Sequence, residues 1–109
     1  MQNLVNVRQN NFGLAESELG ILQSVVRSFP EIERVGIFGS RALGTYKKAS
    51  DIDIVLYGKL VDRHMANKVA SALEDSILPY FVDVVAYNEV RVAEFKEHID
   101  KYAKDLENI

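Results

Sequence analysis

The spacing of apolar residues along the chain predicts helices that alternate with short strands. In three segments apolar side chains recur every three or four residues, which is the period of an amphipathic helix. Pro30 and Pro79 follow the first two segments and are expected to end them, because proline disfavours helical backbone in the residue before it. Asn88 precedes the third segment and is expected to cap it. The apolar positions are Leu19, Leu22, Val26 and Phe29 within 15–29, Met65, Val69, Leu73 and Ile77 within 64–78, and Val92, Phe95, Ile99, Tyr102, Leu106 and Ile109 after Asn88.

Shorter runs rich in β-branched and aromatic residues predict strands. They are RVGIFG at 34–39, DIDIVLYG at 51–58 and YFVDVVAY at 80–87. The helix between the second and third runs implies a parallel pair of strands, whereas the short connection that begins with SRALG favours an antiparallel pair. SRALG itself has room only for a turn or a short helix.

This order of elements predicts an α/β (α+β) domain with a small mixed sheet of about three or four strands, packed with helices. One domain is expected to span 1–109, because a chain of 109 residues is long enough for one core and no more. Residues 1–13 are polar and rich in asparagine, and they are expected to form a flexible arm or an edge strand.

The composition narrows the possible classes of function. Apolar residues make up 48% of the chain, which is enough for a packed core. The net charge of −3 argues against a general nucleic-acid binder, which is normally strongly basic. The absence of cysteine excludes disulfides, thiolate metal sites and cysteine nucleophiles. The sequence shows neither a signal peptide nor an apolar run of membrane-spanning length, so a soluble cytoplasmic protein is expected.

Two close aspartates follow a Gly-Ser turn in the stretch GSRALGTYKKASDID. Asp51 and Asp53 share one face of the second predicted strand, where like charges repel each other. Two carboxylates on one rigid strand suit a hard divalent ion such as Mg²⁺. Gly39 lets a ligand approach the backbone closely, and the amides and hydroxyl at Ser40 can cradle phosphates. The pattern therefore predicts a site for a metal ion and phosphates.

Asp83 lies in the middle of the third apolar run, where an unpaired carboxylate is costly to bury. If the third strand lies beside the second, Asp83 joins the other two aspartates. Three carboxylates on adjacent strands can hold two metal ions for in-line phosphoryl transfer. Arg41, Lys47 and Lys48 supply positive charge nearby.

Simpler explanations exist for each feature taken alone. A Gly-Ser pair after a strand is usually a plain turn, and Asp83 is as readily a salt-bridge partner as a ligand. The YKK sequence at 46–48 is most simply a solvated loop tip. His64 and His98 are isolated from the pattern, and no role is assigned to them. The conjunction of the turn, the Asp-x-Asp pair and the third aspartate favours the functional interpretation.

The sequence GSRALG…SDIDIVL…VDVV resembles the signature of the polymerase-beta-type nucleotidyltransferase superfamily. In length it is similar to the minimal nucleotidyltransferases, antitoxin-type proteins usually encoded beside a HEPN-domain protein. The resemblance covers roughly 14–108. Leu43 stands where many relatives carry a second arginine, so any charge contact from that position is missing.

The resemblance implies a nucleotide site and a metal site that share one turn and two strands. Asp83 would hold the catalytic metal and help to deprotonate the incoming hydroxyl. The nucleotide-binding residues would be Gly39, Ser40 and Arg41, and the ligands of two Mg²⁺ ions would be Asp51, Asp53 and Asp83.

The resemblance further implies transfer of AMP from ATP to a hydroxyl, with release of pyrophosphate. The favoured acceptor is a tyrosine of a cognate HEPN ribonuclease toxin, which AMPylation would neutralise. Two alternatives stay open: a non-catalytic antitoxin that neutralises its partner by binding, and a small-molecule nucleotidyltransferase that acts as an oligomer. Neither a nucleic acid nor a membrane is expected as a direct partner.

Overall fold

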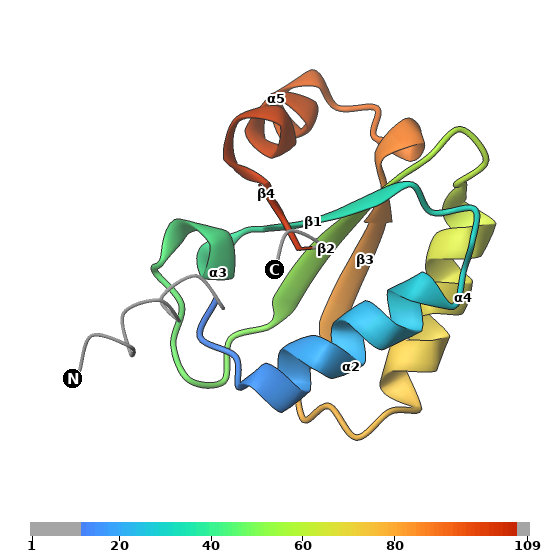
Figure 1. Cartoon of the computed structure of the whole chain (residues 1–109). Helices are drawn as coiled ribbons and strands as arrows, with labels where there is room; N and C mark the ends of the chain where they lie inside the picture. The colour runs from blue at the N-terminus through green and yellow to red at the C-terminus, as the bar shows by residue number, and fades with distance from the viewer. Residues whose placement is uncertain (1–11, 107–109) are drawn as a thin grey trace.

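The computed structural model describes residues 12–106 and places helices and strands in the predicted order (Figure 1). The α/β class expected from the sequence is confirmed. The elements are α2 (Glu16–Arg27), β1 (Arg34–Phe38), α3 (Ser40–Leu43), β2 (Ile52–Tyr57), α4 (Arg63–Glu74), β3 (Val82–Ala86), the 3₁₀ helix η1 (Tyr87–Glu89), α5 (Ala93–Tyr102) and β4 (Lys104–Asp105).

The strands form one four-stranded mixed sheet in the order β3-β2-β1-β4. As predicted, β1 and β2 are antiparallel and β2 and β3 are parallel, with α4 as the connection between the parallel pair. The register places Phe38 opposite Asp53, and Asp53 beside Asp83. The end of β1 therefore meets the start of β2 and of β3 at one edge of the sheet.

The two faces of the sheet are covered differently. Helices α2 and α4 lie on one face and enclose the main core, whereas α5 packs on the other face (Figure 1). On that second face, Phe38 and Val55 contact Ile99, and the rings of Phe38 and Phe95 meet edge to face at 5.7 Å. Because α5 covers only part of this face, the start of β2 and of β3 is left accessible there.

The last helix is shorter than its apolar spacing predicts. It ends at Tyr102, and Lys104 and Asp105 instead form β4, which pairs antiparallel with β1. The amide of Leu106 then donates to the carbonyl of Val35, and the Leu106 side chain is fully buried in the main core. Burying a leucine stabilises the fold by about 1.5–3 kcal/mol, which favours the extended segment that places Leu106 in the core. The last predicted apolar position, Ile109, lies outside the described residues.

Two other local expectations are wrong. Asn88 does not cap α5: it lies in η1, and its side-chain amide donates to the carbonyls of Gly58 and Val61. Ile77 does not continue the apolar stripe of α4, because the helix ends at Glu74. The chain turns at Ser76, and Ile77 is 87% exposed.

The described part of the first thirteen residues is packed rather than loose. Phe12 is buried in the main core, and its carbonyl accepts a hydrogen bond from Arg41. Residues 1–11, for which an arm or an edge strand is expected, lie outside the described residues. Within 12–106, no helix has the length and apolar character needed to cross a bilayer.

Candidate active site

Asp51, Asp53 and Asp83 lie on the part of the sheet that α5 leaves accessible. Ile52 and Ile54 point into the main core, so the alternation along β2 turns Asp53 to the opposite face. Asp51 immediately precedes β2, and Asp83 is the direct neighbour of Asp53 on β3. The three aspartates predicted from the sequence thus lie together on one edge of the sheet, Asp53 half-buried and the other two exposed.

The Gly-Ser turn joins β1 to α3 directly beside Asp53. Gly39 has a φ of 74°, a backbone conformation that residues with a side chain rarely adopt. A Cβ atom on Gly39 would run into the Asp53 carboxylate. Glycine is therefore required both by the turn and by the close approach of the carboxylate. Ser40 follows at the first position of α3.

We expect Gly39→Ala to lower the free energy of unfolding by about 1–3 kcal/mol, because the variant combines backbone strain with a steric conflict. Gly20→Ala is the matched control, since Gly20 is exposed in α2 and a Cβ there meets nothing within 4 Å. The control should gain up to about 1 kcal/mol. Urea unfolding of both variants measures the two effects. Equal stability of Gly39→Ala and wild type would show that the turn tolerates a side chain.

The electrostatics of Asp53 reflect its neighbours. Partial burial raises the pKa of the Asp53 carboxyl above its ordinary value of 3.8, and the charges of Asp83 and then Asp51 raise this pKa further. All these causes disfavour the ionised form in the folded protein. A cation placed beside Asp53 would relieve this repulsion.

The chemistry of this donor set suits Mg²⁺, which prefers carboxylate oxygens and keeps several water ligands. Within residues 12–106, no three His, Cys, Asp or Glu side chains stand close enough to hold an ion as they are placed. Asp51 and Asp83 are exposed, so their side chains can rotate towards Asp53 without disturbing the core. The residue types therefore fit a divalent ion, and holding one would require the side chains of Asp51 and Asp83 to turn towards Asp53.

Arg41 is placed differently from the other predicted site residues. Its side chain is buried, and its guanidinium donates to the backbone carbonyls of Phe12, Lys48 and Ser50. Most of its hydrogen-bond donors are therefore occupied by backbone carbonyls of the protein itself. Nucleotide binding by Arg41 stays a prediction. Lys47 and Lys48 are exposed in the loop before β2, as a solvated loop tip would be.

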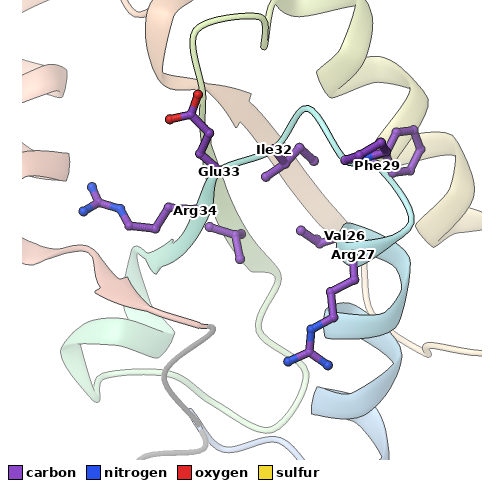
Figure 2. A pocket seen from close by; sticks show the side chains of 8 residues that line it. Val26, Arg27, Phe29, Ile32, Glu33 and Arg34 are labelled. Carbon is purple, nitrogen blue, oxygen red and sulfur yellow. The ribbon is translucent and has the colours of Figure 1, made fainter.

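A separate hollow lies at the other end of β1. Figure 2 shows the side chains around it, with those of Arg27, Glu33 and Arg34 carrying the charged groups. Its lining residues are Val26, Arg27, Phe29, Pro30, Ile32, Glu33, Arg34 and Val35. Because Arg34 and Gly39 flank opposite ends of β1, this hollow is not part of the candidate site.

Comparison with known families gives a match over most of the chain. Residues 21–107 match the model of the polymerase beta nucleotidyltransferase domain. The chain belongs to the polymerase beta nucleotidyltransferase family. The resemblance stated from GSRALG and SDIDIVL is thereby confirmed. Among proteins with curated functions, none matches this nucleotidyltransferase significantly.

Several solved structures share the fold of this nucleotidyltransferase. A toxin–antitoxin complex with AMP-PNP is 24% identical, with a TM-score of 0.68 over 81% of this chain and 71% of that chain. A mutant MntA–HpeT toxin–antitoxin complex is 25% identical, with a TM-score of 0.64 over 84% of this chain and 71% of that chain. The complex of a tri-AMPylated Shewanella oneidensis HEPN toxin with an MNT antitoxin is 22% identical, with a TM-score of 0.57 over 84% and 70% of the two chains.

The sequence interpretation missed the surroundings of Arg41. The guanidinium of Arg41 lies over the rings of Tyr46 and Tyr80, 5.2 Å and 4.8 Å from their centroids. The sequence places Tyr46 in a loop tip and Tyr80 at the start of a predicted strand, and no spacing rule links them to Arg41. Only the folded chain of this nucleotidyltransferase brings the three side chains together.

Proposed function

We propose that this nucleotidyltransferase transfers AMP from ATP to a hydroxyl of a HEPN-type toxin and thereby neutralises that toxin. The single observation that carries the proposal is the neighbouring pair Asp53 and Asp83 beside the Gly39 turn, in a domain of this family. The folds of toxin–antitoxin complexes, one with AMP-PNP and one with a tri-AMPylated toxin, support the choice of nucleotide and partner.

In this proposal the Gly39–Ser40 turn binds the triphosphate, and the three carboxylates bind the metal ions. The backbone at Gly39 and the hydroxyl of Ser40 would bind the triphosphate, because hydrogen-bond donors match phosphate oxygens. Asp51, Asp53 and Asp83 would hold two Mg²⁺ ions, which when bound neutralise the triphosphate and align the reacting oxygens. The raised pKa of Asp53 is consistent with carboxylates gathered for a cation rather than for the stability of the fold.

Asp83 is assigned to the acceptor. It lies one strand further from the Gly39 turn than Asp53, and a hydroxyl that approaches the α-phosphate from that side would meet Asp83 first. The acceptor oxygen forms a bond with the α-phosphorus while the bond from that phosphorus to the bridging oxygen breaks. Asp83 accepts the hydroxyl proton, and pyrophosphate leaves.

Labelled ATP tests the proposed reaction. After incubation with Mg²⁺ and a cognate HEPN-type protein, we expect label from the α-phosphate, but not from the γ-phosphate, to remain on that protein. The double variant Asp51→Asn/Asp53→Asn should transfer no label. Label carried over from the γ-phosphate would indicate a kinase. Neutralisation of the partner without label from either position would favour binding alone.

A further inference from the structure

Arg41 is the one polar or charged side chain that is buried among residues 12–106, with 2% of its surface exposed. Burying a charge is costly unless hydrogen bonds compensate for lost water. Nε and Nη2 of Arg41 donate to the Ser50 carbonyl at 3.2 Å and 2.9 Å, and Nη1 donates to the Phe12 carbonyl at 2.9 Å. Nη2 also donates to the Lys48 carbonyl at 3.3 Å. This side chain therefore binds two segments that are far apart in the sequence.

The guanidinium of Arg41 also contacts aromatic rings, in addition to the hydrogen bonds that its N–H groups donate. The rings of Tyr46 and Tyr80 lie within cation–π range of it, at 5.2 Å and 4.8 Å. Tyr80 immediately precedes Phe81, whose carbonyl accepts a hydrogen bond from the amide of Ile52. Arg41, its three carbonyl partners and these two rings are called the Arg41 clamp below. The clamp joins the segments that lead into β2 and β3.

The position of the clamp in the sequence connects it to the site. Arg41 directly follows Ser40, and Ser50 directly precedes Asp51. The clamp thus holds the two ends of an exposed loop together, one at the phosphate turn and the other at a carboxylate. Inside the loop, the Ser50 hydroxyl accepts the amide of Lys47 at 2.7 Å, which tightens the same end.

We propose that Arg41 is a positioning residue for the transfer reaction. Through Ser50 it fixes Asp51 relative to the Gly39–Ser40 turn, so that metal and triphosphate ligands are in place together. This inference rests on the proposed function and gives Arg41 a role that requires no contact with either substrate. A planar guanidinium can serve carbonyls in several directions at once, whereas a lysine ammonium places its donors at one point. Arg41→Lys therefore keeps the charge and loses the clamp.

The test compares the Mg²⁺ requirement of wild type and Arg41→Lys. We expect the Mg²⁺ concentration for half-maximal AMP transfer to rise about tenfold, and excess Mg²⁺ to restore part of the rate, because a misplaced Asp51 weakens the metal site. The matched control is Val69→Ala, a truncation in the buried face of α4. The control should lower the melting temperature and leave the Mg²⁺ requirement unchanged.

A second readout needs no transfer. Mn²⁺ bound in the presence of a non-hydrolysable ATP analogue can be counted by electron paramagnetic resonance, and Arg41→Lys should bind it about tenfold more weakly than wild type and Val69→Ala. Unchanged Mn²⁺ affinity and unchanged Mg²⁺ requirement would overturn the inference. If wild type transfers no AMP, the proposed function fails, yet the Mn²⁺ comparison still decides the role of Arg41.

A milder variant covers the case in which Arg41→Lys does not fold. Tyr80→Leu removes one ring from the guanidinium, and Tyr80→Phe keeps the ring as the matched control. We expect Tyr80→Leu to shift the Mn²⁺ affinity in the same direction by a smaller factor, and Tyr80→Phe to leave it unchanged. Equal affinity for both variants and wild type would contradict the clamp.

Discussion

Asp53→Asn is expected to abolish AMP transfer and to make the ligand-free protein more stable at neutral pH. The substitution replaces a negatively charged metal ligand with a neutral amide, so the rate of transfer should fall by about 10³-fold or more. It also removes a half-buried charge that Asp83 and Asp51 repel. The same carboxylate thus raises the rate of transfer and lowers the stability of the ligand-free fold.

The gain in stability depends on pH. The folded state raises the pKa of Asp53 above its ordinary value of 3.8, so the folded protein holds that proton more tightly than the unfolded chain. At a pH above the raised pKa, the ionised carboxylate destabilises the fold relative to the amide. As the pH falls through the raised pKa, Asp53 becomes protonated and the advantage of Asp53→Asn disappears.

Thermal unfolding across this range checks the expectation. Asp53→Asn should melt above wild type near neutral pH, by no more than a few degrees because solvent screens this half-exposed charge. Asp62→Asn is the control: Asp62 caps α4 through the amide of Met65, and asparagine caps equally well. A lower melting temperature for Asp53→Asn would make Asp53 a structural residue instead of a ligand.

Asp83→Asn is expected to separate chemistry from nucleotide binding. Loss of the proton acceptor should slow transfer by about 10²–10⁴-fold. Asp51 and Asp53 remain to hold metal-bound ATP, so Mg²⁺ with ATP should still raise the melting temperature. A ligand at 100 times its dissociation constant stabilises the fold by about 2.7 kcal/mol.

The double variant Asp51→Asn/Asp53→Asn is the comparison for this experiment. It should lose both the transfer and the thermal response to Mg²⁺ with ATP, whereas ATP without a divalent ion should have little effect on any variant. A full rate for Asp83→Asn would remove Asp83 from the reaction. An equal thermal response with and without Mg²⁺ would contradict a metal-bridged nucleotide.

The strands that carry the site could be predicted because both are short runs rich in β-branched residues, and residues 51–54 alternate between aspartate and isoleucine. Ile52 and Ile54 must point into the core, which turns Asp53 and the preceding Asp51 away from it. The position of Asp83 followed from the helical connection between β2 and β3, since such a connection makes the two strands parallel neighbours.

The parts that could not be predicted depend on contacts between distant residues. Leu106 fits the helical spacing, yet backbone pairing with β1 and burial in the main core draw it into an extended segment. Arg41 is a basic residue in a phosphate-type turn, and nothing local shows that Phe12 and Ser50 will supply carbonyls to it. In both cases tertiary contacts override the local pattern.

The most direct test of the account is the intact mass of the HEPN-type partner after incubation with this chain, ATP and Mg²⁺. The account predicts that wild type adds one or more AMP masses to a tyrosine of the partner, and that Asp83→Asn adds none in the same time. It is contradicted if wild type never changes the partner's mass while the Asp51→Asn/Asp53→Asn double variant neutralises the partner in cells as well as wild type does.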